Sequence, residues 1–486
     1  MIYKLRPYQE DCVKSISDYI NSDRHDPVLI VGPVGCGKSI LIAEAARLMG
    51  DKTLILQPSK ELLQQNHDKI TSYGIPATIY SASCGKKELS NMIYATLGSI
   101  KKVVGQLKEM GIRNVLIDEA HAGYSPEDGS EFMTFMNELK PSKVIGFTAT
   151  PCRLKNMSIG QTSYSQLNFI TRMRPVYFKN LIHVIQVEEM IRQGFWTPLK
   201  YETWDFNGDA LKLNSNGSEY TAESISEAVR KNGLNNLILR RLMVLKDICR
   251  SILVFMDSVE SCNTAAEWMN AKICAGIAEV VHGGTPKKQR EAIVERFKSG
   301  KTKVVFNYSA LGTGFDHPGL DCVIVGRPTF SFSSFYQWLG RAVRIKDGKD
   351  SALVVDCCNN SSRFGDIREL SIENYKGYGW GMFIGDKLIT NIPMGDKVTK
   401  TDLDIKAAKK DRRRGLAQGV TAAPIPGRPP HPLGSTVMAF GKYSGWMLHS
   451  IPVSYFKFIN ETFDWDNDRN KDIKEYIDFL IKNNRL

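Results

Sequence analysis

The segment Gly32-Pro33-Val34-Gly35-Cys36-Gly37-Lys38-Ser39 decides the fold that this sequence predicts. It matches the pattern G-x-x-x-x-G-K-[ST], follows an apolar run at Val28–Val31 and precedes a helix-like stretch at Ser39–Met49. Glycines let backbone N–H groups point at phosphate oxygens, while Lys38 can reach the β- and γ-phosphates and Ser39 can ligate Mg²⁺. The segment therefore predicts a strand, a phosphate-binding loop and a helix in succession.

Short apolar runs alternate with helix-like stretches on both sides of this loop and again in the second half of the chain. The runs are Val28–Val31, Thr53–Leu56, Val115–Ile117 and Val144–Phe147, then Ser251–Phe255, Val280–His282, Lys303–Phe306, Cys322–Val325 and Ala352–Val355. This alternation is typical of α/β domains with parallel sheets. The sequence therefore predicts two such domains in tandem.

The composition limits the class of protein. The chain has 486 residues, of which 42% are hydrophobic, and this excludes wholesale disorder. Its net charge of +12 favours a polyanionic partner. The ten cysteines show no metal-ligand spacing, so zinc and iron–sulfur centres are not expected. No apolar run approaches the roughly 20 residues of a membrane span, and we expect no membrane partner and a cytoplasmic location in a bacterium or a phage-infected host.

The composition changes near residue 399. A basic run at Lys406–Arg414 leads into Ala422–Leu433, which carries five prolines. The basic run can follow a nucleic-acid backbone or can be an ordinary solvated linker. We predict domains at residues 1–178 and 179–398, a linker at 399–434, and a small α+β module at 435–486.

An acidic pair follows a later strand of the first predicted sheet. Asp118-Glu119-Ala120-His121 comes directly after Asn114–Ile117. Alone, two acids there are more often a solvated turn or a helix cap. At the end of a strand in the sheet that carries the phosphate loop, Asp118 can hold Mg²⁺ and Glu119 can orient or deprotonate a water molecule. This pattern predicts the metal and water side of an ATPase.

The loop and the Asp-Glu-Ala-His tetrapeptide together resemble superfamily 2 helicases and translocases of the DEAH-box type. The resemblance covers about Leu5 to Arg368 and implies two RecA-like domains that use ATP and Mg²⁺. It implies that Lys38, Asp118 and Glu119 are catalytic, that Gly35, Gly37, Lys38 and Ser39 bind the nucleotide, and that Ser39 and Asp118 hold the metal.

Further motifs of this superfamily occur in order in the first half. Leu5-Arg6-Pro7-Tyr8-Gln9 resembles the adenine-binding motif, which implies nucleotide contacts from Arg6 and Gln9. Two segments occur at positions where the family contacts a nucleic-acid backbone, Gln57–Leu62 and Thr96–Ser99. The resemblance implies DNA contacts from Ser59, Lys60, Thr96 and Ser99. Each is weak alone, because Ser and Thr cap helices everywhere. Thr148-Ala149-Thr150-Pro151 resembles the coupling motif, which implies a coupling role for Thr148 and Thr150 together with His121.

The second half carries the remaining motifs. Gln337-Trp338-Leu339-Gly340-Arg341-Ala342-Val343-Arg344 matches Q-x-x-G-R-x-x-R. Arginines three apart share a helix face, so we expect Arg341 and Arg344 to project together at a γ-phosphate as catalytic finger residues. The alternative is a solvated basic face. The resemblance also implies nucleotide contacts from Gly314, Asp316 and Gln337, and DNA contacts from His282, Gly283 and Thr313.

Within the superfamily, the pattern most resembles the DNA-directed UvsW, RecG, XPB and restriction-translocase group, and within it the UvsW-type branch-migration helicases of phages. This implies ATP-driven 3′ to 5′ movement on single-stranded and branched DNA, with remodelling of forks, D-loops or Holliday junctions. Two alternatives stay open. One is an RNA helicase, because Asp-Glu-Ala-His also occurs in that class. The other is a non-unwinding duplex translocase that serves a partner nuclease.

The C-terminal segment resembles the small module at the end of exonuclease X, on Met438–Gly445, Ile451-Pro452 and Tyr455. Lys442 can contact DNA phosphate while neighbouring aromatic side chains stack on bases. Equally, the aromatic side chains can be the core of a domain of about 50 residues.

Overall fold

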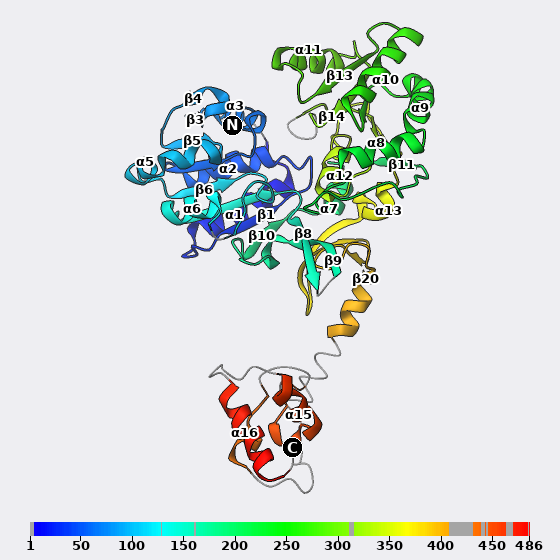
Figure 1. The fold of residues 1–486 in the computed structure, drawn as a ribbon. Helices are drawn as coiled ribbons and strands as arrows, with labels where there is room; N and C mark the ends of the chain where they lie inside the picture. Colours follow the sequence, from blue (N-terminus) through cyan, green and yellow to red (C-terminus); the bar gives the residue numbers. More distant parts are fainter. Residues whose placement is uncertain are drawn as a thin grey trace. The chain divides into compact units, whose positions relative to one another are not determined.

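The computed structural model describes residues 4–127, 129–159, 162–310, 315–407, 431–438, 443, 446–462, 470–484 and 486 (Figure 1). The chain divides into two compact units, Met1–Tyr375 with Gly379–Thr399, and Lys376–Tyr378 with Lys400–Leu486. Most of the predicted basic linker lies outside the described residues, and the three predicted boundaries between the four segments remain predictions.

The first unit contains an eight-stranded sheet whose pairings are parallel except that between β3 and β4. Its strands, in spatial order, are β10 (Asn180–Val184), β1 (Val28–Val31), β7 (Lys143–Thr148), β6 (Asn114–Ile117), β2 (Thr53–Leu56), β5 (Met92–Ala95), β3 (Thr78–Ser81) and β4 (Lys86–Lys87). All four strands predicted in the first half are present. The sheet extends past residue 178, because β10 pairs with β1.

Helices of the first half precede or connect these strands. They are α1 (Pro7–Asn21), α2 (Lys38–Met49), α3 (Lys60–Ser72), α4 (Leu97–Ile100), α5 (Val104–Glu109) and α6 (Glu131–Leu139). All four residues of β1 are buried, as are those of β2 and β6. Continuous burial is expected of parallel strands covered on both faces, and it explains why these strands are uninterrupted apolar runs.

A second sheet of six parallel strands follows in the same unit. In spatial order it contains β11 (Leu199–Thr203), β16 (Ala352–Asp356), β15 (Cys322–Val325), β12 (Ile252–Phe255), β14 (Val304–Tyr308) and β13 (Ala278–His282). Its helices are α7 (Val187–Arg192), α8 (Ala222–Lys231), α9 (Leu234–Ile248), α10 (Val259–Lys272), α11 (Lys287–Lys298), α12 (Phe332–Leu339) and α13 (Asn360–Phe364). The five strands predicted here are present, and the predicted α/β class with two parallel sheets is confirmed.

The core divides along the second sheet. Leu253 and Phe255 belong to a cluster of buried residues that continues under the first sheet, whereas Ile252 and Val254 belong to a separate cluster with α9 and α10. Neighbouring residues of a strand point to opposite faces, so β12 contributes to both clusters. The shared cluster packs the two sheets into one unit.

Two small β elements were not anticipated from the sequence. One is the hairpin of β8 (Cys152–Ile159) and β9 (Thr162–Phe169), and the other is an antiparallel sheet of β17 (Leu370–Tyr375), β18 (Gly379–Ile384), β19 (Lys387–Leu388) and β20 (Val398–Thr399). They meet at Asn391, whose Oδ1 accepts from Phe169 N at 3.0 Å and whose N–H donates to Leu167 O at 2.7 Å.

The C-terminal unit has its own core around two helices, α15 (Val453–Thr462) and α16 (Lys471–Lys482). Phe456 and Tyr476 are fully buried, whereas Trp446 and Phe458 are 38% and 58% exposed. Some of its aromatic side chains are therefore core and others are surface. Among the described residues of this unit, β pairing is limited to the bridge between Val437 and Met447.

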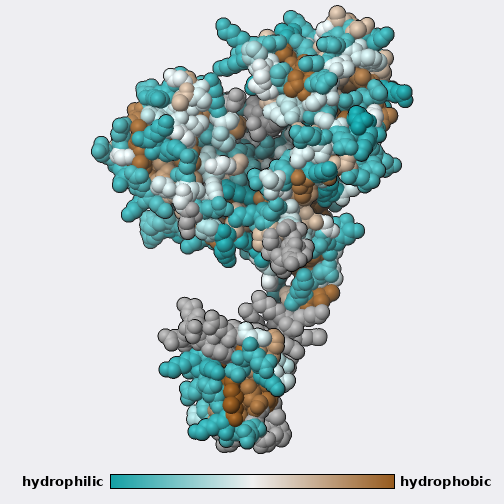
Figure 2. Space-filling model, viewed as in Figure 1, coloured by the Kyte–Doolittle hydropathy of each residue, from teal (hydrophilic) through white to brown (hydrophobic). Residues whose placement is uncertain are grey.

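The visible face of the first unit is mainly polar (Figure 2). Figure 2 shows hydrophilic side chains over most of the visible face of the first unit, with hydrophobic ones in small patches. No helix within the described ranges is long and apolar enough to cross a membrane.

Packing around β7 gives a test of the fold. A Cβ on Gly146 would lie 2.7 Å from Phe178 Cζ and 2.9 Å from Ala120 Cβ, both in the core. We predict that Gly146→Ala destabilises the unit by about 1–3 kcal/mol, because the core must shift to admit one methyl group. Urea unfolding measures this change.

Gly105→Ala is the matched control, because Gly105 lies in α5 and its added Cβ would meet nothing within 4 Å. Its expected effect is neutral, or stabilising by up to about 1 kcal/mol. Equal stability of the two variants would contradict the packing described here.

Candidate active site

The predicted phosphate-binding loop joins β1 to α2, in the order of elements that the sequence predicts. Gly35 and Gly37 have φ angles of +82° and +83°, a backbone region that favours glycine. A Cβ on Gly37 would also lie 2.6 Å from Gln9 Nε2. Helix α2 begins at Lys38, so the unpaired N–H groups of its first turn adjoin the loop. Both glycines are therefore required by the local geometry.

The N-terminal motif supports this loop. The Tyr8 hydroxyl and Gln9 Nε2 both donate to Cys36 O, at 3.1 and 2.9 Å, and Gln9 Oε1 accepts from Arg6 N at 3.0 Å. The Arg6 guanidinium lies 4.6 Å from the centre of the Phe195 ring. Both ends of the Gln9 amide are thus occupied by backbone groups, and adenine contact by Arg6 and Gln9 remains a prediction.

The acidic pair follows β6 and faces the loop. Lys38 Nζ lies 3.9 Å from Glu119 Oε1. Asp118 is fixed by Asn66 Nδ2, which donates to its Oδ2 at 3.0 Å, and by Glu119 N, which donates to its Oδ1 at 2.9 Å. Glu119 has a φ of +46°, an uncommon value for a residue with a long side chain. Strain of this kind is concentrated at functional sites.

The two carboxyl groups differ in pKa. Burial, and then repulsion from Glu119, raises the pKa of Asp118 to about 7. Burial also opposes ionisation of Glu119, but Lys38 and His121 outweigh it and hold the pKa of Glu119 at about 2. Glu119 is therefore charged at neutral pH, and a cation beside Asp118 would stabilise its charged form as well.

The residues present fit Mg²⁺. Ser39 and Asp118 line one cavity and offer a hydroxyl and a carboxylate, the oxygen ligands that this ion prefers. The described residues hold no cluster of three His, Cys, Asp or Glu side chains suited to a metal ion. Mg²⁺ commonly takes one or two protein ligands and completes its shell with phosphates and water, so the small ligand set is adequate.

The prediction that Arg341 and Arg344 share a helix face is wrong. Helix α12 ends at Leu339, and the chain then turns, with Arg341 N donating to Trp338 O at 3.2 Å. A Cβ on Gly340 would lie 2.5 Å from Val34 Cγ2 in the phosphate loop. The helix therefore stops where the backbone approaches the loop, and both arginines project from the segment that follows.

Both arginines contact a neighbouring loop of the second half. Arg341 Nη1 donates to Phe315 O at 2.6 Å, and Arg344 forms an ion pair with Asp316. Burial lowers the pKa of Arg341 to about 10 and also lowers that of Arg344. With a pKa of about 10, Arg341 remains charged at neutral pH.

Residues of both halves line one cavity of about 310 Å³. From the predicted set it brings together Arg6, Gly35, Gly37, Lys38, Ser39, Asp118, Glu119, Asp316, Gln337, Arg341 and Arg344. The cavity is lined by more cationic side chains (Arg6, Lys38, Lys69, Arg341, Arg344) than acidic ones (Asp118, Glu119, Asp316). This excess suits a polyphosphate that binds between the two sheets.

The predicted coupling residues lie next to this cavity. His121 Nδ1 lies 2.8 Å from Thr148 Oγ1 and 3.3 Å from Glu119 Oε2. On its other side, Ser333 Oγ of α12 lies 3.2 Å from His121 Nε2 and 3.1 Å from Thr150 Oγ1. A chain of polar contacts thus runs from Glu119 to a helix of the second half.

The predicted DNA-contact residues of the first half lie beyond the carboxyl ends of β2 and β5, which are neighbours. Ser59 caps α3, where its Oγ accepts from Leu62 N at 3.3 Å, and Lys60 follows it. Thr96 precedes α4 and its hydroxyl donates to Ser99 Oγ at 3.1 Å. The structure brings the four residues to one edge of the sheet, while their DNA contacts remain predictions.

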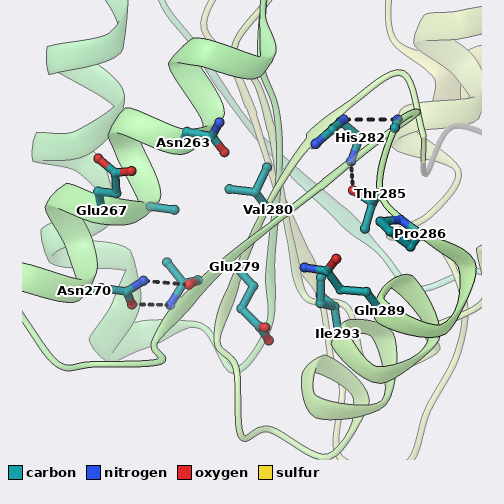
Figure 3. Close-up of a pocket in the computed structure, with 13 residues that line it drawn as sticks. Asn263, Glu267, Asn270, Glu279, Val280, His282, Thr285, Pro286, Gln289 and Ile293 are labelled. Carbon is teal, nitrogen blue, oxygen red and sulfur yellow. Dashed lines mark hydrogen bonds between the residues drawn. The ribbon is translucent and has the colours of Figure 1, made fainter.

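His282 is the last residue of β13 in the second half and Gly283 follows it, beside a second cavity of about 330 Å³ that His282 lines (Figure 3). His282 N donates to Thr285 Oγ1 at 3.0 Å, and Gly284 N donates to His282 Nδ1 at 3.1 Å. The ionisable side chains lining the cavity are Glu267, Glu279 and His282. This lining does not suit phosphate. Gly314, Thr313 and Lys442 lie outside the described residues.

Four residues of the site escaped the sequence analysis. Asn66 holds Asp118, Ser333 contacts His121, and Thr197 and Lys349 bond to the segment of the arginines. Contacts between distant parts of the chain identify Asn66, Ser333 and Thr197, and contacts across a turn identify Lys349.

Two family models match the chain. Residues 2–153 match the model described as Type III restriction enzyme, res subunit, and residues 234–346 match the one described as Helicase conserved C-terminal domain. The chain belongs to the superfamily 2 helicase family. The first match contains the phosphate loop and the acidic pair, and the second contains Arg341 and Arg344. The superfamily resemblance is confirmed, and the UvsW-type branch remains a prediction.

This superfamily 2 helicase is similar to a 51.5 kDa protein of Lactococcus phage (isolate 7-9), with 25% identity over 68% of this chain and 65% of that protein. It is also similar to the ATP-dependent DNA helicase Hel308 of Pyrococcus horikoshii, with 25% identity over 69% of this chain and 49% of that one. The chain spans 65%, 52% and 58% of the lengths of three curated relatives that it matches.

The fold is similar to that of the ATP-dependent Type ISP restriction-modification enzyme LlaBIII bound to DNA. The TM-score is 0.54 at 15% sequence identity, over 74% of this chain and 28% of that one. At this identity the likeness concerns the fold alone.

The Lys38 contact generates a test of the site. We predict that Lys38→Ala lowers ATP turnover by at least about a hundredfold, because it removes the charge that faces Glu119 and the phosphates. Steady-state phosphate release measures the loss, with circular dichroism as the check on folding. Lys14→Ala is the control, because Lys14 is an exposed lysine on α1. Equal turnover in the two variants would contradict this account of the cavity.

Proposed function

We propose that this chain is a nucleic-acid-stimulated ATPase that works as a DNA helicase or translocase on branched DNA. The observation that supports this proposal best is the single cavity between the sheets. It holds the phosphate loop and the acidic pair on one side and two arginines on the other. A nucleotide bound there would contact both halves of the chain.

Each side chain has a role in hydrolysis. Lys38 and the first turn of α2 bind the β- and γ-phosphates, and Ser39 with Asp118 would hold Mg²⁺, which neutralises phosphate charge. Glu119 is ionised at neutral pH and can orient or deprotonate the attacking water. Arg341 and Arg344 stabilise the charge that develops on the transferred phosphoryl group.

Hydrolysis would be linked to movement through the interface between the halves. The triphosphate draws the arginines toward the phosphate loop, and loss of the γ-phosphate weakens that attraction. The contacts of His121 and Ser333 connect Glu119 with α12, so a change at the water position can reach the second half. Repeated closing and opening would change the grip on a nucleic-acid strand.

DNA is the partner we favour. Relatives include proteins named as DNA helicases, and the predicted contact residues Ser59, Lys60, Thr96 and Ser99 offer hydroxyl, amine and backbone groups suited to phosphate oxygens. In this proposal His282, Gly283 and Thr313 contact the strand from the second half. The movement is 3′ to 5′, and the substrates are forks, D-loops or Holliday junctions.

Two alternatives have different consequences in solution. An RNA helicase would be stimulated by RNA. A duplex translocase that serves a partner nuclease would hydrolyse ATP on duplex DNA without separating strands, and the description of the first family model, a restriction-enzyme subunit, favours it as the second candidate.

The test is steady-state ATP hydrolysis with single-stranded DNA, duplex DNA, a four-way junction and RNA. We predict that the four-way junction stimulates ATP hydrolysis most strongly, because branch migration engages several strands at once. Lys38→Ala serves as the blank. Strand separation on the same junction is measured in parallel.

Stimulation by RNA alone would overturn the DNA assignment, and stimulation by duplex DNA without strand separation would favour the translocase. A chain ending at Thr399 tests the C-terminal module in the same assay. Unchanged DNA affinity and unwinding would contradict our proposal that the module, through Lys442 and its aromatic side chains, contacts DNA.

A further inference from the structure

The two arginines lack the support of a helix. They follow the end of α12 and belong to a segment, residues 340–345, whose backbone N–H groups donate back to α12 only as far as Ala342, which donates to Leu339 O at 3.0 Å. Finger residues must be held to a fraction of an ångström to act on a transition state. Some other contact must therefore fix this segment.

Thr197 provides part of the support. Its N–H donates to Val343 O at 2.8 Å, and its hydroxyl donates to Arg344 O at 2.7 Å. Thr197 is 2% exposed, so these bonds are shielded from water. They join the segment to the strand region before β11.

Lys349 provides a second part of the support. Its Nζ donates to Ala342 O at 2.7 Å, to Arg344 O at 2.8 Å and to Pro318 O at 3.2 Å. An ammonium group has three N–H donors and no acceptor, so these carbonyls use its full capacity. The first two lie in the arginine segment, and the third lies two residues after Asp316, the ion-pair partner of Arg344.

A turn directs Lys349 back to this point. Lys349 N donates to Lys346 O at 3.0 Å, and Gly348 has a φ of +74°, which glycine adopts without strain. The turn reverses the chain between the arginine segment and β16. The lysine side chain therefore returns to the carbonyls that precede it.

The charge of Lys349 is maintained at neutral pH. Burial lowers the pKa of Lys349 to about 8, and the neighbouring Arg344 and Lys346 act in the same direction, while Asp321 opposes them. Partial burial of an ammonium group is costly unless it is fully hydrogen-bonded. Here three carbonyl oxygens supply those bonds.

We propose that Lys349 is a positioning residue for the arginine pair: its ammonium group clamps the carbonyls of Ala342 and Arg344 and ties them to the loop that carries Asp316. This proposal rests on the proposed ATPase function. Lys349 does not line the nucleotide cavity, so it acts through Arg341 and Arg344 and not by contact with the phosphates.

The test compares Lys349→Met with Lys346→Met in the full chain. Methionine keeps much of the length of the lysine and removes its donors, and Lys346 is an exposed lysine of the same turn. We expect Lys349→Met to lower kcat for ATP by between about tenfold and a hundredfold, with KM changed by less than about threefold, because misplaced fingers weaken transition-state contacts most. Lys346→Met should match the wild type.

A double-mutant cycle separates positioning from general stability. In an Arg344→Ala background, we expect the fold-decrease in kcat caused by Lys349→Met to be at most about a third of the fold-decrease that it causes in the wild type. The reason is that one of the two side chains that Lys349 positions is gone. An unchanged kcat for Lys349→Met, or the same factor in both backgrounds, would overturn the proposal.

A second variant keeps the test decisive if Lys349→Met does not fold. Thr197→Val removes the hydroxyl donated to Arg344 O and keeps the side-chain shape, so it should lower kcat in the same direction and show the same dependence on Arg344. An unchanged kcat would overturn the proposal.

The failure of the positioning role and the failure of the proposed function give different results. A wild-type chain without ATP turnover would overturn the proposed function itself. An active wild type together with an unchanged kcat in Lys349→Met would overturn only the positioning role.

Discussion

The rest of the site depends on the close approach of the second half to the phosphate loop at Val34. Trp196 Nε1 donates to Val34 O at 2.9 Å, and Gly340 is so close that a Cβ there would lie 2.5 Å from the Val34 side chain. Next to it, a Cβ on Gly35 would lie 3.4 Å from Val343 Cγ2. Glycine at 340 permits this approach, and the approach ends the helix and directs Arg341 and Arg344 at the cavity.

Burial of charge is the cost of this arrangement, and opposite charges offset it. Asp118 is buried and Glu119 and Arg341 are partly buried, and each is stabilised by groups from elsewhere in the chain: Asn66, Lys38 and the Phe315 carbonyl. Burial lowers the pKa of Arg341 while the charge of Glu119 raises it. Two charged groups from opposite halves therefore stabilise each other, and a nucleotide that enters between them meets positioned charges.

The sequence predicted the parts of the fold whose causes are local. Strands such as Thr53–Leu56 are short apolar runs buried on both faces, so their pattern alone identifies them. The hairpin of β8 and β9 was not predicted from the sequence, because its residues are mostly polar. Its packing against Asn391 is also a contact between residues more than two hundred positions apart. The prediction that Arg341 and Arg344 share a helix face was wrong. Spacing places two side chains on one face only where the helix continues, and packing against Val34 ends α12 before these residues. Ser333 and Lys349 carry no motif signal, since only the folded chain brings Ser333 to His121 and the Lys349 ammonium group to three backbone carbonyls.

The central claim is that the second half completes the active site of the first within one chain, and Arg341→Ala tests it most directly. Affinity for a fluorescent ATP analogue and single-turnover hydrolysis are measured on the same preparation. The account predicts affinity within about threefold of the wild type and hydrolysis slower by about 10³- to 10⁵-fold, because Arg341 acts on the charge that develops in the transition state. Hydrolysis within tenfold of the wild type would show that the cavity between the sheets is not where ATP is cleaved.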